Sequence, residues 1–309
     1  MYLTIQINNN CDLSCTFCVQ GGDVSRGGIL DNTSTHVLPQ DALRKSLDEI
    51  DQTIDEINIM GGEPLLTFET LVETVKTIRA NPHQKEQTLW VLTNGLGLNQ
   101  RVLGWAHENN IGFAVAIDGI EKSQRSLDQL VQKSAVGSEI IRIIQDLPHV
   151  SIRRVITNGF APFAASVWGL RKMFPHVEEF TIDWDRYKMP ELNIQHLHHA
   201  TRQFLILRDL DPDWTDWLSI MSFWKGPDGF TCNCAGNYYL TNNGDLNTLL
   251  DHPNFMPGFS PKETETEPFN GCVKISNLMG RDNFETWRSQ LRAITGAAAA
   301  DTALTRNAS

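Results

Sequence analysis

Short runs of β-forming residues alternate with longer amphipathic helical patterns from Tyr2 to about Trp184, and this alternation constrains the fold more than any other feature. The β-forming runs predict six strands, at Tyr2–Ile7, Glu56–Met60, Thr88–Thr93, Gly112–Ile117, Ser151–Thr157 and Glu179–Trp184. Helices are expected between them, near Gln40–Ile50, Thr67–Ala80, Gln100–Asn109, Glu139–Asp146 and Phe163–Met173. Six such repeats predict parallel strands joined by right-handed crossovers, and therefore an α/β fold. A partial (β/α)6 TIM-like barrel suits six repeats better than a closed barrel of eight.

The composition changes after Trp184. Residues Leu192 to Leu210 predict a helix, and an aromatic-rich connection follows from Trp214 to Trp224. A β-forming run from Tyr238 to Thr241 leads into Asn-Asn-Gly-Asp, which predicts a hairpin. We therefore expect a barrel core over residues 1–190 and a small extension with a helix and a hairpin over 191–295. A flexible tail is expected over 296–309, which has no periodic apolar face.

Composition excludes several classes of protein. Hydrophobic residues make up 41% and charged residues 20% of the 309 residues, which is typical of a globular chain. The net charge of −11 argues against a nucleic-acid partner, because such proteins present basic surfaces. The early polar residues interrupt any signal-peptide pattern, and no run of apolar residues is long enough to span a membrane. A cytoplasmic location is expected, where cysteines are more often metal ligands than disulfides.

Three cysteines, Cys11, Cys15 and Cys18, follow the first predicted strand directly. Loops at the carboxyl ends of barrel strands build the active face of such folds. Thiolates suit an iron–sulfur cluster or zinc, and a cluster is normally held by four of them. A cluster held by only three would leave one iron open to chelate another molecule. A zinc knuckle, or three unrelated buried cysteines, are the alternatives.

The segment from Cys11 to Cys18 resembles the C-x3-C-x2-C signature of the radical S-adenosylmethionine (radical SAM) superfamily, including the aromatic Phe17 before the last cysteine. The resemblance implies a [4Fe-4S] cluster whose open iron binds the amino and carboxylate groups of SAM. It further implies reductive cleavage of SAM to a 5′-deoxyadenosyl radical that abstracts hydrogen from a substrate carbon.

A second motif, Gly61-Gly62-Glu63-Pro64, follows the second predicted strand and resembles the GGEP motif of this superfamily. The glycines allow the backbone to approach a ligand closely, and Glu63 supplies a negative charge suited to an ammonium group. The resemblance assigns the loop to the amino group of SAM. Taken alone, the same letters also suit a tight turn before a helix that starts at Pro64.

Two further segments end predicted strands. Thr93-Asn94-Gly95 resembles a T-N-G segment whose polar side chains face the SAM ribose or carboxylate, although Asn-Gly is also a common tight turn. Asp118 lies in Ala-Ile-Asp-Gly, which resembles the S-x-D-G segment of sulfatase maturases. Ala116 replaces the serine of that segment. The H-D-x-x-R run expected next is absent, with Gln124, Arg125 and Asp128 in its neighbourhood.

Charged residues close the last two predicted strands. Arg153 and Arg154 point to opposite faces of the fifth strand, so one of them can enter the barrel, and Arg153 is the candidate partner of the SAM carboxylate. Asp183 and Asp185 share one face at the end of the sixth strand. They are candidates for substrate binding or for a catalytic base, or they accept backbone hydrogen bonds in the loop.

A second set of cysteines, Cys232, Cys234 and Cys272, surrounds the predicted hairpin. Cys-Ala-Gly followed by the hairpin resembles the SPASM and twitch extensions of radical SAM enzymes, which implies an auxiliary iron–sulfur cluster. The cysteine expected after the hairpin is absent, so a fourth ligand would come from Asp251, His252, substrate or solvent. Zinc, or no metal, are the alternatives.

The resemblance implies an oxidoreductase of natural-product biosynthesis, and modification of a ribosomally made peptide, by crosslinking or epimerisation, is the leading expectation. An electron donor such as flavodoxin or ferredoxin is implied. Only ten residues precede Cys11, so a separate leader-peptide-binding protein is an expected partner. The alternatives are a small-molecule dehydrogenase of the aminosugar type and a non-catalytic zinc scaffold.

Overall fold

The structure is a computed structural model that describes most of the first 248 residues. The described ranges are 2–18, 36–50, 54–120, 125–156, 162–184, 194–220, 224–225 and 238–248, with Thr286 and Ser289. Contacts divide the chain into two compact units. Unit 1 comprises Met1–Ile117, Glu121–Ile152 and Asn233–Phe259, and unit 2 comprises Asp118–Ile120, Arg153–Cys232 and Ser260–Ser309.

Unit 1 is a largely parallel sheet covered by helices. Its strands, in spatial order, are β10 (Leu246–Thr248), β9 (Tyr238–Leu240), β1 (Tyr2–Gln6), β2 (Glu56–Met60), β3 (Thr88–Thr93), β4 (Ile111–Ala116) and the first half of β5 (His149–Ile156). The helices are α1 (Gln40–Glu49), the 3-10 helix η2 (Pro64–Thr67), α2 (Phe68–Ala80), α3 (Gln100–Asn109), α4 (Leu127–Lys133) and α5 (Glu139–Asp146). β9 runs parallel to β1, and β10 pairs antiparallel with β9. The late hairpin β9–β10 therefore extends the sheet beside the first strand.

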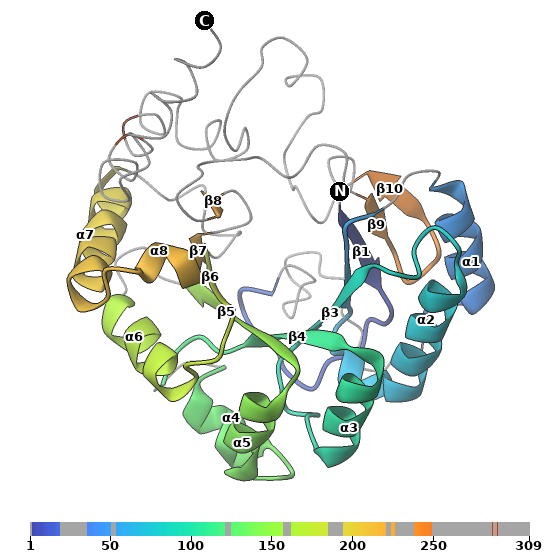
Figure 1. Cartoon of the computed structure of the whole chain (residues 1–309), viewed down its shortest axis with the longest axis horizontal. Coiled ribbons are helices and arrows are strands. Elements are labelled where there is room, and N and C mark those ends of the chain that lie inside the picture. Colours follow the sequence, from blue (N-terminus) through green and yellow to red (C-terminus); the bar gives the residue numbers. More distant parts are fainter. Residues whose placement is uncertain are drawn as a thin grey trace, which may run out of the picture. The chain divides into compact units, whose positions relative to one another are not determined.

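The core of unit 1 follows from alternation along the strands. Rows of aliphatic side chains stand in register across β1 to β4 and are fully buried: Leu3, Ile57, Leu89 and Ile111, then Ile5, Ile59, Val91 and Phe113. Figure 1 shows α1, α2 and α3 lying along one face of these strands. The helices contribute their own apolar stripes, such as Leu71, Val75 and Ile78 of α2. Burial of these two surfaces against each other drives the layer packing.

Unit 2 continues the alternation. It holds the second half of β5, α6 (Ala164–Met173), β6 (Glu179–Trp184), α7 (Ile194–Leu210), α8 (Trp214–Trp217), β7 (Leu218–Ile220) and β8 (Trp224–Lys225). β7 pairs in parallel with β6, and β8 pairs antiparallel with β7. Its core is aromatic: the Phe204 ring stacks on Trp214 at 5.6 Å between centroids and contacts Phe163 at 5.1 Å.

The predicted α/β fold with a partial (β/α)6 barrel is confirmed, because β1 to β6 follow one another in order and each is followed by a helix. Five of the predicted elements match to the residue, and the others differ by one or two residues at one or both ends. The hairpin is confirmed as β9–β10, with Gly244 at φ +93° in its turn. The helix α4 was not predicted, because seven residues are too few to show a helical period.

The predicted division at residues 190 and 295 remains a prediction, and its tail lies outside the described residues. In the part of the chain that the structure describes, no helix has the length and apolar character needed to span a bilayer.

Candidate metal and cofactor site

The loop after β1 is bound to the loop after β2 by four hydrogen bonds centred on Asn8. The Gly62 N–H donates to the Asn8 carbonyl at 3.1 Å and to its Oδ1 at 2.9 Å. The Asn8 amide nitrogen donates to the Glu63 carbonyl at 2.9 Å and to Thr67 Oγ1 at 2.7 Å. Asn8 is fully buried, so this amide satisfies backbone groups that water does not reach. It sits three residues before Cys11 and ties the cysteine loop to the glycine loop.

The two glycines of the second loop are needed because the first loop lies against them. A Cβ at Gly61 would stand 2.3 Å from Asn8 Oδ1, and one at Gly62 would stand 2.2 Å from the Asn10 carbonyl oxygen. The Glu63 N–H also donates to the Asn10 carbonyl at 2.7 Å. We expected these glycines to let the backbone approach a ligand closely. In the structure the chain that leads into Cys11 lies against them. Their assignment to the amino group of SAM stays a prediction.

Glu63 is the most deeply buried acid of the site, with 1% of its surface exposed. Its Oε1 accepts from Thr93 Oγ1 at 2.7 Å and from the Leu65 N–H at 3.0 Å, and its Oε2 accepts from the Asn94 N–H at 2.7 Å. Burial raises the pKa of Glu63 to about 7, while these three donors act in the opposite direction. The carboxyl group therefore caps η2 and joins the ends of β2 and β3.

Thr93 and Asn94, at the end of β3, are turned toward the same pair of loops. Thr93 Oγ1 accepts from the Gly95 N–H at 3.0 Å while it donates to Glu63. The Asn94 amide donates to Asp12 Oδ1 at 2.6 Å, and its Oδ1 accepts from the Leu96 N–H at 2.9 Å. Asn94 therefore connects the end of β3 to the cysteine loop itself.

The three cysteines lie together on the segment after β1. Cys15 is buried, Cys11 and Cys18 are half-buried, and none is disulfide-bonded. The Cys18 N–H donates to the Cys15 carbonyl at 3.1 Å, which closes a tight turn between two of the thiols. Phe17, within this turn, has a buried ring, and the guanidinium of Arg125 lies over that ring at 4.6 Å from its centroid.

The electrostatics of Cys11 fit a cationic metal group. Burial raises the pKa of Cys11 to about 12, although the Leu13 N–H donates to its sulfur at 3.4 Å and lowers it. The negative charges of Glu63 and Asp12 add to the rise. Iron binds the thiolate, so a bound metal ion displaces the thiol proton. Three soft sulfur donors beside negative charge therefore suit an iron–sulfur cluster.

The described residues contain no group of three His, Cys, Asp or Glu side chains placed to hold a single metal ion. A cluster distributes its thiolates over separate iron atoms, so its ligands do not have to converge on one point.

The hairpin β9–β10 contacts the base of the cysteine loop. The buried hydroxyl of Tyr239 donates to Gln6 Oε1 at 3.1 Å, and the Gln6 amide donates to Asn9 Oδ1 at 2.7 Å. These bonds link a residue of the late hairpin to the residues just before Cys11.

The remaining predicted residues have the following places. Pro64 is buried and begins η2. Asp118 is buried in unit 2, where its Oδ1 accepts from the Val155 N–H at 2.9 Å.

Arg154 packs against α6 by donating to Ser166 Oγ and to the Phe163 carbonyl, and burial lowers its pKa to about 10. Arg153, the residue predicted to contact SAM, therefore lies on the other face of β5.

Several predictions fall where the structure gives no side chain. Asp183 is part of β6, but its side chain is not described, and Asp185 lies outside the described residues. The second cysteine set, Cys232, Cys234 and Cys272, and its candidate partners Asp251 and His252 also lie outside them. Roles for these residues stay predictions.

The sequence reading missed Asn8, Gln6 and Tyr239. The only signal was local: three successive asparagines, Asn8 to Asn10, stand directly before Cys11, and buried asparagine at a strand end is typical of a side chain that bonds to backbone. Gln6 and Tyr239 are 233 residues apart, and nothing in the sequence pairs them.

Comparison with known proteins agrees with this site. Residues 4–119 match the family described as a 4Fe-4S single cluster domain. The GTP 3′,8-cyclase of Pectobacterium atrosepticum is 26% identical over 193 residues, which cover 62% of this chain and 53% of that protein. The GTP 3′,8-cyclase of Aeromonas hydrophila is 24% identical over 246 residues, which cover 70% of this chain and 63% of that protein. The chain thus spans less than two thirds of these relatives.

Solved structures share the fold. Native anSMEcpe with bound AdoMet and Cp18Cys peptide superposes with a TM-score of 0.59 at 15% identity, over 98% of this chain and 99% of that one. Streptococcus suis SuiB bound to S-adenosylmethionine superposes with a TM-score of 0.51 at 11% identity, over 93% of this chain and 63% of that one.

The strand order, the three-cysteine loop and the glycine loop bonded to it define a protein built to hold an iron–sulfur cluster at the carboxyl ends of parallel strands. Together with the fold, these likenesses support a member of the radical SAM superfamily.

Proposed function

We propose that this protein binds a [4Fe-4S] cluster through Cys11, Cys15 and Cys18 and uses it to cleave SAM reductively. The observation that carries the proposal is the bonding of the cysteine loop to the glycine loop, through Gly62 to Asn8 and Glu63 to Asn10. When bound, the cluster supplies the electron that cleaves SAM, and the resulting 5′-deoxyadenosyl radical removes a hydrogen atom from a substrate carbon.

The chain's own residues hold this site in shape. Asn8 and the two glycines fix the path of the backbone into Cys11, so the thiols are positioned before any metal arrives. Glu63 holds the ends of β2 and β3 together, and the Asn94 amide reaches across to Asp12 of the cysteine loop. The buried ring of Phe17 adds an apolar side chain next to Cys18 in the sequence.

Anaerobic reconstitution with iron and sulfide tests this proposal. The protein is expected to absorb near about 400 nm and to form 5′-deoxyadenosine from SAM and a reductant. Cys15→Ala is expected to abolish both signals. Ser14→Ala changes the exposed neighbour of Cys15 and is the matched control, which keeps them. A colourless zinc protein that leaves SAM intact would refute the proposal in favour of a metal-binding scaffold.

For the substrate, we propose a peptide, modified by crosslinking or epimerisation. The likeness to native anSMEcpe with bound AdoMet and Cp18Cys peptide extends over nearly the whole of both chains and supports this choice. A flavodoxin or ferredoxin would deliver the electron, and a separate protein would present the leader of the peptide.

Deuterium transfer identifies the substrate class. Candidate peptides encoded beside the gene, deuterated at the α or β carbons, are expected to pass deuterium to 5′-deoxyadenosine. GTP and an aminosugar are the competing substrates, because the curated relatives are named for GTP and a small-molecule dehydrogenase is the other expectation. Transfer from either of these, and from no peptide, would overturn the peptide proposal.

We further propose that Cys232, Cys234 and Cys272 hold an auxiliary iron–sulfur cluster. The hairpin that follows the first two of them is part of unit 1, and Tyr239 connects it to the residues before Cys11. Reconstituted protein is expected to contain about eight iron atoms per chain, falling to about four when these three cysteines are replaced by alanine. An unchanged iron content after the replacement would exclude the second cluster.

A further inference from the structure

The two faces of the unit 1 sheet are buried to different degrees. The face toward α1, α2 and α3 holds the fully buried aliphatic rows described above. The opposite face, which we call the inner face, holds the alternate residues of the same strands, because successive side chains of a strand point to opposite sides. On β2 and β3 these include Asn58, Met60, Trp90 and Leu92, and all four are half-buried. The described part of the chain therefore leaves the inner face partly exposed.

Three large apolar side chains of the inner face are neighbours. Met60 and Leu92 stand beside one another on adjacent strands, one residue beyond the paired Ile59 and Val91. Trp90 precedes Leu92 by two residues and so lies on the same face. Contiguous apolar surface that stays exposed in a folded protein is typical of a binding site. Met60, Trp90 and Leu92 therefore form a candidate binding surface for an apolar group.

The indole of Trp90 lies against the backbone of β4. Gly112 pairs with Trp90, and a Cβ on Gly112 would stand 2.7 to 2.9 Å from three adjoining atoms of the six-membered ring. A ring that met this position with its edge would hold one atom clearly closer than the two beside it, so the indole turns its face to Gly112. The ring thus lies across the sheet, and half-burial leaves part of it uncovered.

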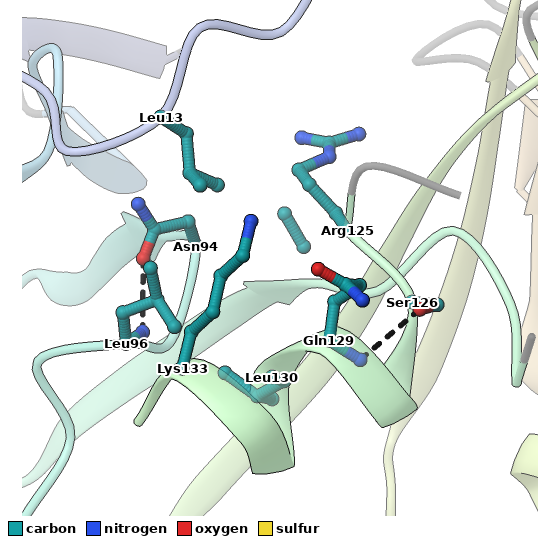
Figure 2. A pocket seen from close by; sticks show the side chains of 9 residues that line it. Leu13, Asn94, Leu96, Arg125, Ser126, Gln129, Leu130 and Lys133 are labelled. Carbon is teal, nitrogen blue, oxygen red and sulfur yellow. Dashed lines mark hydrogen bonds between the residues drawn. The ribbon is translucent and has the colours of Figure 1, made fainter. Parts of the chain in front are cut away.

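The inner face ends at the loops of the cluster site. The glycine loop begins directly after Met60. Leu13 of the cysteine loop and Asn94 line the same small cavity, and Figure 2 shows the two side chains close together. Trp90 stands four residues before Asn94, which is about 13 Å along the strand. A group resting on the indole therefore extends toward the loops that would hold the cluster.

Polar side chains of the same face are bonded to one another. Tyr239 donates to Gln6, which in turn donates to Asn9. The Asn58 amide donates to Glu56 Oε1 at 3.0 Å and is thus turned toward the amino end of β2, away from the cysteine loop. A polar group of a ligand would lose its water here and compete with these bonds, whereas an apolar group has no hydrogen bonds to lose.

We propose that the surface of Met60, Trp90 and Leu92 binds an aliphatic or aromatic side chain of the substrate, and that the Trp90 ring limits how long that side chain can be. This inference deepens the proposed function and rests on it for the peptide that carries the side chain. It also separates the substrate classes, because a nucleotide or an aminosugar would place polar groups on this surface.

Fluorine-19 NMR of reconstituted protein labelled with 5-fluorotryptophan locates the binding. The chain has eight tryptophans, and the Trp90 signal is the one missing in Trp90→Phe. It is expected to shift in a saturable manner with N-acetyl-leucine amide. N-acetyl-asparagine amide has nearly the same shape but a polar end, and it is expected to bind about 10-fold more weakly. The signal of Trp105, which packs against Phe68 on the helix side, is the internal reference.

Trp90→Phe tests whether the ring limits length. The smaller ring is expected to admit a longer side chain, so the affinity for N-acetyl-tryptophan amide relative to N-acetyl-leucine amide should rise about 10-fold. Ligand-detected NMR measures both affinities. A purely structural role of Trp90 would lower the two affinities together and leave their ratio unchanged. Trp105→Phe is the matched control, because Trp105 is also half-buried, and it should keep the native ratio.

The outcomes separate this inference from the proposed function. If the protein forms 5′-deoxyadenosine from SAM but the Trp90 signal shifts no more than the Trp105 signal with the leucine amide, the inference is overturned. Equal binding of the leucine and asparagine amides, or an unchanged affinity ratio in Trp90→Phe, would overturn it as well. A leucine-specific shift of the Trp90 signal in protein that leaves SAM intact would instead refute the proposed function alone.

Discussion

Gly62 shows how strongly single residues decide the shape of this site. Its backbone N–H bonds to Asn8, and its missing side chain leaves the space that the Asn10 carbonyl occupies. A methyl group there would meet backbone atoms, which cannot rotate away as a side chain would. The conformation of the loop that leads into Cys11 therefore depends on this glycine.

Gly62→Ala is expected to destabilise the protein by about 2–3 kcal/mol through overpacking and to lower its iron content after reconstitution. Thermal unfolding and iron analysis measure the two effects. Gly104→Ala is the matched control: a Cβ there meets nothing within 4 Å, and the residue lies inside α3. That change is expected to stabilise the protein by roughly 0.5–1 kcal/mol. Equal effects of the two substitutions would contradict the packing account.

Glu63 gives the protein a pH-dependent stability. Its pKa is about 7 in the folded chain, against an ordinary value of 4.5, so the folded state binds more protons than the unfolded state between these values. The contribution of Glu63 to the free energy of unfolding is therefore highest below pH 4.5 and falls as the pH rises to about 7.

Urea unfolding, measured at intervals of about half a pH unit between pH 5 and 8, checks this dependence. Glu63→Gln is expected to remove the fall and to cost about 1–3 kcal/mol, because the Asn94 N–H loses its acceptor. Glu73→Gln, at an exposed carboxyl on α2, is the control and should keep the native slope. If the free energy of unfolding of the unsubstituted protein rose between pH 5 and 8, burial would not dominate the pKa of Glu63.

At the scale of elements, the hairpin β9–β10 supports the first strand. β9 pairs in parallel with β1, at Leu3 to Tyr238 and Ile5 to Leu240, and Tyr239 adds a side-chain bond to Gln6. The strand that leads into the cysteine loop is therefore held on both sides, by β2 and by β9.

Tyr239→Phe is expected to destabilise the protein by about 1–2 kcal/mol, because it leaves the buried Gln6 amide oxygen without its donor. Tyr238→Phe, the neighbouring half-buried residue of the same strand, is expected to change stability by less than about 0.5 kcal/mol. Denaturant midpoints of the two variants make the comparison. A larger effect at Tyr238 would mean that the bond to Gln6 is not what the hairpin contributes.

At the scale of the molecule, we expect the fold to persist without the metal. The cores of both units consist of aliphatic and aromatic side chains on strands and helices, and the cysteine loop is bonded through Asn8 and Gly62. Removal of iron by a chelator is expected to leave the far-ultraviolet circular dichroism unchanged and to lower the melting temperature by a few degrees, as loss of a bound ligand does. Loss of helical signal on chelation would show that the cluster organises the fold.

Much of this architecture could be predicted from the sequence because its causes are local. The strands β2, β3 and β6 and the helices α3 and α5 have their predicted bounds, since apolar periodicity and flanking polar residues act within one element. The spacing of Cys11, Cys15 and Cys18 indicated the chemistry for the same reason: three thiols within eight residues stay close to one another in space.

The tertiary structure decided which groups meet. The sequence did not show that Asn8 and Asn10 lie against the glycines at 61 and 62, which follows from the parallel pairing of β1 and β2 that brings their carboxyl ends together. It also did not show that the Glu63 oxygens accept hydrogen bonds from Thr93, Asn94 and Leu65. The roles of these residues toward SAM stay predictions. Residue type and spacing determine what chemistry a chain carries, whereas hydrogen-bond partners across a sheet depend on register and burial, which exist only once the strands have paired.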